Sequence, residues 1–202
     1  ECGAAGVWGA AGGGTAAFGR QGKAGGGRAR EAACALVPGL LALNCHENVT
    51  EGLRTGLSML ADDVGNGNGE GDIPAHIRVM GAAAVFTAAL VRSEEKKSPV
   101  APDAGAGHAK DFLRMLRDEP ASAAEVEALN AYMVTVADHG MNASTFTARV
   151  IASTRAGTIS AVVGALCALK GPLHGGAPGP VLDMLDEIGT AANIEPWLTR
   201  EI

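Results

Sequence analysis

Backbone must pack closely against backbone in this chain, because glycine is abundant and large aromatic side chains are rare. The 202 residues include 29 Gly but only 2 Trp, 1 Tyr and 4 Phe. A core of Ala, Leu, Val and Gly lets elements approach one another closely, whereas a β-sandwich calls for more aromatic and β-branched residues. The composition therefore predicts helices pressed together, in a chain long enough to bury a substantial core.

Apolar residues recur at the helical period along most of the chain. In the segment 48–61, four of them fall on one stripe, namely Val49, Leu53, Leu57 and Leu60. The same reasoning predicts helices over 30–43, 48–61, 73–91, 109–116, 122–137, 144–156, 158–169 and 181–188. No stretch shows the alternation of a strand, so the fold class is predicted to be all-α, with seven or eight helices.

The helix expected from residue 122 onward has the clearest start. Ser122 and Glu125 have the spacing of a capping box, in which each residue satisfies a free backbone N–H of the other. We expect the apolar residues of this helix to face the core; they are Val126, Leu129, Tyr132, Met133 and Val136.

Residues 1–30 differ from the rest of the chain. They contain 11 Gly, 8 Ala, four basic residues and one acid. No apolar period is sustained there, and the apolar bulk is too small to offset the entropy lost on ordering. We therefore expect residues 1–30 to form a Gly/Ala-rich flexible tail. The spacing of its glycines fits neither a Walker phosphate loop nor a dinucleotide-binding turn.

The charge and apolar patterns argue against several classes of protein. With 16 Lys and Arg against 22 Asp and Glu, the net charge is −6, which is the wrong sign for a general nucleic-acid binder. The apolar runs 81–91 and 159–169 are shorter than the roughly 20 residues that span a bilayer, so no membrane is expected. The four Cys form no CxxC pair, which favours reduced thiols in a cytoplasmic protein. No residues have metal-ligand spacing, so no metal is expected.

Two of the five histidines stand in segments that suit a ligand. His139 lies where one helix ends and a polar helix start follows, with Asn142 close behind. Asn142 and its neighbours either cap the new helix or, with free N–H groups and the imidazole, form an anion site. His174 precedes Gly175 and Gly176, which allow a ligand to approach the backbone closely. The residues alone leave a structural and a functional interpretation of both histidines open.

These two histidines also carry a resemblance to a known family. From residue 137 the chain reads ADHGMNASTFTARVIASTRAGTISAVVGALCALKGPLHGGA, which is similar to the citrate synthase family, where ADHELNASTFAARV and LKGPLHGGA occur at this separation. From residue 100, VAPDAGAGHAKDFLRML resembles the family's APDP…HAxNFLxML stretch. From residue 181, VLDMLDEIG resembles the helix after the GPLHGG turn. The resemblance extends over about residues 50–198 and does not include residues 1–30.

The resemblance implies a fold and a reaction. Residues 31–174 would form part of a multi-helical large domain, and residues 175–202 would begin a small domain. The family condenses acetyl-CoA with oxaloacetate to give citrate and CoA, the entry step of the tricarboxylic acid cycle. The activity implied is that of an acyltransferase that works without a metal or an organic cofactor, on two small-molecule substrates. Family members are generally homodimers, and the small residues between 148 and 168 would suit close helix packing between subunits or within one.

The resemblance also implies roles for the residues of the two motifs. His174 would be the catalytic group that donates a hydrogen bond to the thioester oxygen and stabilises the developing enol. His139 would help to bind oxaloacetate, with Asn142 ordering the pocket. Gly175 and Gly176 would leave room for the substrates and for domain closure.

The chain departs from the family pattern in ways that bear on activity. The family's second catalytic His, in a GFGHRVY-like motif, and its catalytic Asp find no match among these residues. Gly140 stands where Glu is usual, and Pro178 where many members have Asn. We therefore expect this chain alone to form no citrate, as a fragment, a truncated product or half of a split enzyme. The alternatives are a 2-methylcitrate synthase, which uses propanoyl-CoA, and a non-catalytic helical interaction protein derived from the family.

Overall fold

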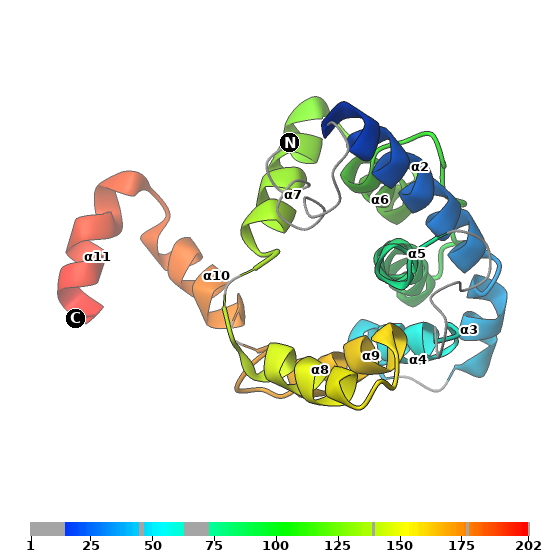
Figure 1. Cartoon of the computed structure of the whole chain (residues 1–202). Coiled ribbons are helices and arrows are strands. Elements are labelled where there is room, and N and C mark those ends of the chain that lie inside the picture. Colours follow the sequence, from blue (N-terminus) through cyan, green and yellow to red (C-terminus); the bar gives the residue numbers. More distant parts are fainter. Residues whose placement is uncertain (1–14, 45–46, 63–72, 139, 177, 202) are drawn as a thin grey trace.

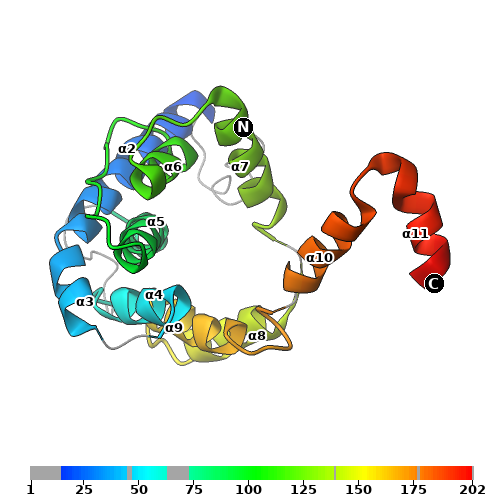
Figure 2. The same cartoon turned by 180° about the vertical axis from the view of Figure 1, so that it is seen from behind.

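The computed structural model describes residues 15–44, 47–62, 73–138, 140–176 and 178–201. Within these residues it has ten α-helices, one short 3₁₀ helix and no strand, which confirms the predicted all-α class. In chain order the elements are α2 (Thr15–Cys34), α3 (Val37–Leu43), α4 (Val49–Ser58), α5 (Ala75–Glu94), α6 (His108–Arg117), α7 (Ala123–Thr135), α8 (Ala143–Ser153), α9 (Thr158–Leu169), α10 (Pro178–Ile188), η1 (Ala191–Asn193) and α11 (Ile194–Glu201). Helices α2, α3, α4 and α6 lie around α5, while α10 and α11 extend away from the others (Figures 1 and 2).

Polar side chains cap the N-termini of α4 and α7. At α4, the Asn48 side chain accepts the backbone N–H of Glu51 at 3.0 Å. At α7, Ser122 and Glu125 form the predicted capping box, with the Glu125 carboxylate accepting the Ser122 N–H at 2.9 Å. Each bond satisfies an N–H group that has no partner within its own helix.

The expectation of a flexible tail is wrong for residues 15–30, which form most of α2. Gly27 of this helix and Gly81 of α5 let α2 pack directly on its neighbours. A Cβ on Gly27 would overlap the backbone carbonyl of Ala104, and a Cβ on Gly81 of α5 would lie 2.7 Å from the Cβ of Ala29. Close backbone contact thus compensates for the small apolar bulk. Residues 1–14, the rest of the expected tail, lie outside the described residues.

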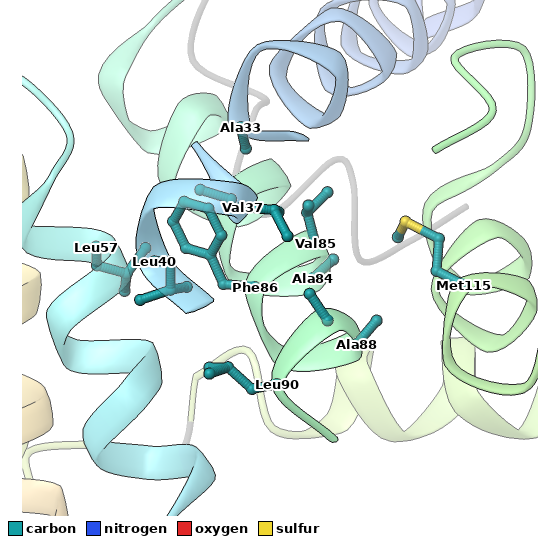
Figure 3. Close-up of a cluster of buried hydrophobic side chains, with 12 residues drawn as sticks. Ala33, Val37, Leu40, Leu57, Ala84, Val85, Phe86, Ala88, Leu90 and Met115 are labelled. Carbon is teal, nitrogen blue, oxygen red and sulfur yellow. The ribbon is translucent and has the colours of Figure 1, made fainter. Parts of the chain in front are cut away.

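The core is built on α5, as Figure 3 shows. Phe86 and Leu90 of this helix are fully buried, together with Leu40 of α3. Gly56 of α4 faces the Phe86 ring, and a Cβ there would lie 2.7 Å from a ring carbon. One of the few aromatic side chains therefore fits into the core because a glycine stands opposite it.

Helix α5 is longer than the apolar run 81–91 that it contains. It extends over Ala75–Glu94, and by length and composition alone it could cross a membrane. However, 67% of its most apolar window is buried inside the protein. A helix whose apolar side chains already pack against other helices has few left for lipid, so α5 has the character of a core helix.

Helix α7 does not face the core as expected. Tyr132 is 62% exposed and Val136 is 41% exposed, which corrects their assignment as inward-facing residues. Val126, Leu129 and Met133 are only partly buried. Among the described residues, α7 packs on α6 and buries no residue fully, so its periodicity predicted the helix correctly but not what the helix packs against.

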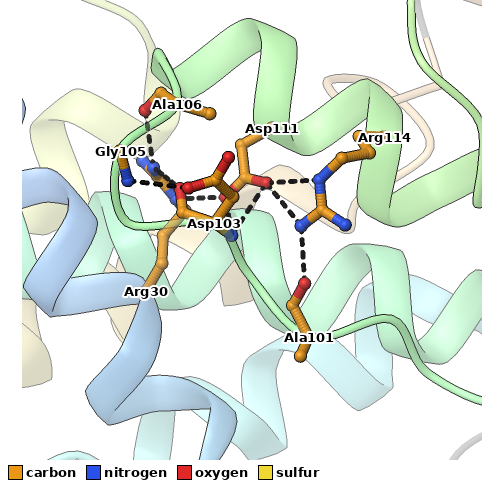
Figure 4. A network of polar contacts seen from close by, with 7 residues as sticks. All are labelled: Arg30, Ala101, Asp103, Gly105, Ala106, Asp111 and Arg114. Atoms are coloured by element: carbon orange, nitrogen blue, oxygen red, sulfur yellow. Dashed lines mark hydrogen bonds and ion pairs between the residues drawn. The ribbon is translucent and has the colours of Figure 1, made fainter.

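A buried ion pair joins α2 to α6 (Figure 4). Arg30 donates from Nε to Asp111 Oδ2 at 2.7 Å, and their side chains are 1% and 0% exposed. A second nitrogen of Arg30 donates to the carbonyls of Asp103 and Ala106. The other carboxylate oxygen of Asp111 accepts from Arg114 at 2.7 Å. Burial of two charges is tolerated because each is paired and hydrogen-bonded.

His108, at the start of α6, makes the stability of this region sensitive to acid. Burial lowers the pKa of His108 below its ordinary 6.5, and the Arg30 charge lowers that pKa further, although Asp111 opposes the shift. The unfolded chain therefore binds more protons than the folded chain just below pH 6.5, and the free energy of unfolding must fall as the pH decreases through this range. Urea unfolding at pH 7.5 and 5.5 should show a smaller loss of stability for His108→Gln than for the parent chain. An equal loss would contradict this assignment.

Candidate functional site

The polar segment before α8 forms one side of the site. The Asn142 side chain accepts the Thr145 backbone N–H at 2.9 Å and caps α8. Its Oδ1 also accepts the Ser144 hydroxyl at 2.8 Å. The structure thus confirms the capping interpretation of Asn142, while its role toward a substrate stays a prediction.

The turn after α9 forms the other side and carries His174. The N–H groups of His174 and Gly175 both donate to the Gly171 carbonyl, at 2.9 and 3.0 Å, which folds residues 171–175 into a compact turn. The partly buried His174 ring lies 2.9 Å, measured from Nε2, from Oγ of Ser144. Since Nε2 is engaged, Nδ1 is the ring nitrogen left to meet a ligand.

The two glycines after His174 are required by the turn itself. A Cβ on Gly175 would overlap the Leu169 carbonyl oxygen, and a Cβ on Gly176 would lie 2.7 Å from that of Pro172. Neither glycine has a positive φ, so each is needed for space and not for an unusual backbone conformation. The room that these glycines would leave for a substrate stays a prediction.

His139, the other predicted histidine, lies outside the described residues. Next to it, Gly140 has a φ of +87° and donates its N–H to Asp138 Oδ1 at 3.0 Å. A φ in this region suits glycine, whereas the Glu usual at this position in the resembled family would be strained in the same conformation.

Carboxylates hold α9 in place at both of its ends. At its start, Asp62 accepts the N–H groups of Ile159 and Ser160 at 2.6 and 2.9 Å. At its end, Lys170 pairs with Glu51 of α4. We call these two contacts, made by Glu51 and Asp62, the α4–α9 clamp. Both suit the helix dipole, with a negative charge at the N-terminus of α9 and a positive one at its C-terminus.

The roles of Glu51 and Asp62 could not be predicted from the sequence, for a physical reason. Asp62 and Ile159 are 97 residues apart in the chain, and Glu51 and Lys170 are 119 apart. No local spacing relates residues that far apart. Ser144 lies inside a recognised motif, but the motif alone does not show that its hydroxyl meets His174. No group of three or more His, Cys, Asp or Glu that could hold a metal ion occurs in the part of the chain that the structure describes.

The arrangement can be compared with known proteins. A family model described as "Citrate synthase, C-terminal domain" matches residues 27–202. The 2-methylcitrate synthase of Mycobacterium tuberculosis is 39% identical over 160 residues, which are 79% of this chain and 40% of that protein. Citrate synthase 2 of Bacillus subtilis is 40% identical over 153 residues, which are 74% of this chain and 41% of that protein.

The fold comparison agrees with the sequence comparison. The crystal structure of citrate synthase from Thermotoga maritima superposes with a TM-score of 0.75 at 28% identity, covering 98% of this chain and 52% of that one. The chain therefore spans about 40% of the length of the two curated relatives and about half of this solved structure. Because the family model matches most of the chain, from residue 27 within α2 onward, this chain belongs to the citrate synthase family.

Proposed function

We propose that this chain supplies part of the active site of a citrate-synthase-type acyltransferase, which condenses acetyl-CoA with oxaloacetate to give citrate and CoA. The observation that carries the proposal is the 2.9 Å contact between His174 and Ser144, because it joins the LKGPLHGG turn to the NAST segment. Relatives named citrate synthase 2 and 2-methylcitrate synthase support the same reaction class. The remaining groups of the site would lie outside these 202 residues.

The role proposed for His174 sets a requirement on Ser144. A carboxylate base removes a proton from the methyl group of the thioester, and the electron pair moves toward the carbonyl oxygen as the enol forms. His174 would donate to that oxygen from Nδ1. A neutral ring that donates from Nδ1 must accept at Nε2. Ser144 would therefore turn its hydroxyl hydrogen from Asn142 to His174, while Asn142 keeps the Thr145 N–H.

The second substrate would lie on the other side of the enol. The enol carbon would attack the keto carbon of oxaloacetate, and water would then cleave the thioester to release CoA and citrate. We propose that His139 and Asn142 help to hold oxaloacetate, and that Gly175 and Gly176 border the space for both substrates. These steps use proton transfer and hydrogen bonding by side chains, so the proposal requires no metal or organic cofactor.

A second candidate is condensation of propanoyl-CoA with oxaloacetate. It is favoured by the match to the 2-methylcitrate synthase of Mycobacterium tuberculosis, which is as similar to this chain as citrate synthase 2 of Bacillus subtilis is. The two reactions differ by one methyl group on the acyl chain, and an apolar pocket distinguishes one such group by about 1–3 kcal/mol.

The reaction can be tested in a graft. Residues of this chain replace the matching 153-residue segment of Bacillus subtilis citrate synthase 2, and CoA release is measured with oxaloacetate and either acyl-CoA. We expect the graft to release CoA, and His174→Ala to slow it about 10²- to 10³-fold, the cost of losing one donor to a developing oxyanion. The isolated 202-residue chain should give no steady release. A rise in propanoyl-CoA preference over the ungrafted enzyme would favour the second candidate.

Two outcomes would contradict the proposal. A graft that is folded by circular dichroism but inactive, or one whose rate does not depend on His174, would favour a non-catalytic interaction protein. Steady CoA release by the isolated chain would contradict the expectation that it is inactive alone.

We also propose that the chain associates as a homodimer through α8. Phe146 and Val150 of this helix are 61% and 50% exposed, which leaves apolar surface for a second subunit. One small residue of α9 is already used within the chain, since a Cβ on Gly164 would overlap the Ile151 side chain of α8. Light scattering of the purified chain should give twice the monomer mass; a monomer at micromolar concentration would contradict the proposal.

A further inference from the structure

The position of His174 depends on where α9 ends. The turn that carries this ring packs directly against the helix end, because Gly175 approaches the Leu169 carbonyl too closely to admit a Cβ. The Gly171 carbonyl, next to the helix end, accepts the N–H groups of both His174 and Gly175. A displacement of the last turn of α9 would therefore displace the imidazole and lengthen its contact with Ser144.

The last turn of α9 is in turn fixed on α4 by charge. Lys170, which immediately follows the helix, pairs with Glu51, whose side chain is only 15% exposed. The Lys170 hydrogen bond holds the pKa of Glu51 below its usual range, so the carboxylate is charged at neutral pH. Glu51 is itself fixed, because its N–H donates to Asn48 and its carboxylate accepts the N–H of Glu47 at 3.2 Å. The pair thus connects a well-held residue of α4 to the base of the His174 turn.

The opposite end of α9 is fixed by the same segment of chain. Asp62, four residues beyond the end of α4, binds the N–H groups of Ile159 and Ser160. A helix held at one end can still pivot about that end, whereas a helix held at both ends has its axis defined. The α4–α9 clamp therefore determines both the direction of α9 and the place where it delivers His174.

We propose that Glu51 is a positioning residue for His174, acting through Lys170 to seat the turn that carries the imidazole against Ser144. The proposal rests on the proposed function for its catalytic meaning. The test measures the state of the His174 ring and not turnover. The positioning role of Glu51 and the proposed function can therefore fail independently of each other.

The experiment uses the full 202-residue chain labelled with ¹⁵N. The imidazole nitrogen resonances of His174 report the hydrogen bond at Nε2, and amide hydrogen exchange reports the mobility of residues 171–175. Glu51→Gln and Lys170→Gln should each shift these resonances and speed exchange about three- to fivefold, the size expected for losing a partly exposed ion pair. The double variant should change no more than either single one, because both remove the same contact. Lys170→Arg should keep the parent values.

A matched control separates positioning from general stability. Glu95→Gln breaks an exposed ion pair with Lys97 at the end of α5 and should leave both readouts unchanged. The proposal is overturned if Glu51→Gln leaves the His174 resonances and the exchange of residues 171–175 at parent values. It is also overturned if exchange rises equally in all helices, or if Lys170→Arg behaves like Lys170→Gln.

Discussion

Replacing Asp111 with Ala should lower the free energy of unfolding by about 3–5 kcal/mol, the cost of leaving a buried charge without its partner. Arg30 would keep its hydrogen bonds to two carbonyls but lose the carboxylate that neutralises it, in a place where its side chain is 1% exposed. Urea unfolding followed by circular dichroism measures the change. We expect local unfolding to begin where α2 meets α6, so proteolysis within α2 should accelerate as well.

Glu187→Ala provides the control for this prediction. Glu187 pairs with Arg200 between α10 and α11, and both side chains are more than half exposed. Solvent screens such a pair, so its loss should change the stability little. If Asp111→Ala destabilised the chain no more than Glu187→Ala does, the Arg30–Asp111 pair would not stabilise the packing of α2 on α6 as its burial indicates.

Replacing Gly175 with Ala should displace the turn that carries His174 while leaving the fold intact. The new methyl group would overlap the Leu169 carbonyl, a backbone atom that cannot rotate away, so the turn must shift. In the graft described above, the rate of CoA release should fall about 10²-fold, because a displacement of about 1 Å at a reacting group has that cost. In the isolated chain, the His174 resonances should lose the signature of the Ser144 contact.

Gly179→Ala is the matched substitution. Gly179 lies four residues further on in α10, and a Cβ there would meet no atom within 4 Å. The same chemical change should therefore leave the rate and the His174 resonances near their parent values. Equal rates for grafts carrying Gly175→Ala and Gly179→Ala would show that the crowding at Gly175 does not control the ring.

The fold was predictable wherever local signals decide it. Helix α9 has the predicted bounds because Gly157 and Gly171 enclose a continuous apolar run, and α7 begins at its capping box. Helix α2 was not predictable in this way. Its glycines lower intrinsic helix propensity, and what stabilises it is contact with α5 and α6, more than 40 residues away in sequence. Helix α11 was also missed, since eight residues with Pro196 in the first turn give a weak local signal.

The same distinction between local signals and tertiary contacts applies to the candidate site. The sequence identified His174 and Asn142 because each lies in a recognisable motif. It could not show that Ser144 connects them, because a hydrogen bond across 30 residues depends on how α8 and α9 pack. Glu51 and Asp62 carry no motif at all; they gain a role only when α4 lies beside α9. Motifs therefore name the groups that could react, whereas tertiary packing determines which groups hold them.

The Arg30–Asp111 pair also has a consequence during synthesis of the chain. The two residues are 81 positions apart, and ribosomes add about 5–20 residues per second. For about 4–16 s after Arg30 is made, the carboxylate that it needs has not yet been translated. For the earlier part of that interval, α2 also lacks the surface of α5, which is complete only once Glu94 has been added. Helix α2, the first helix that the structure describes, therefore becomes stable only after α6 has been translated, and until then water must solvate the Arg30 charge.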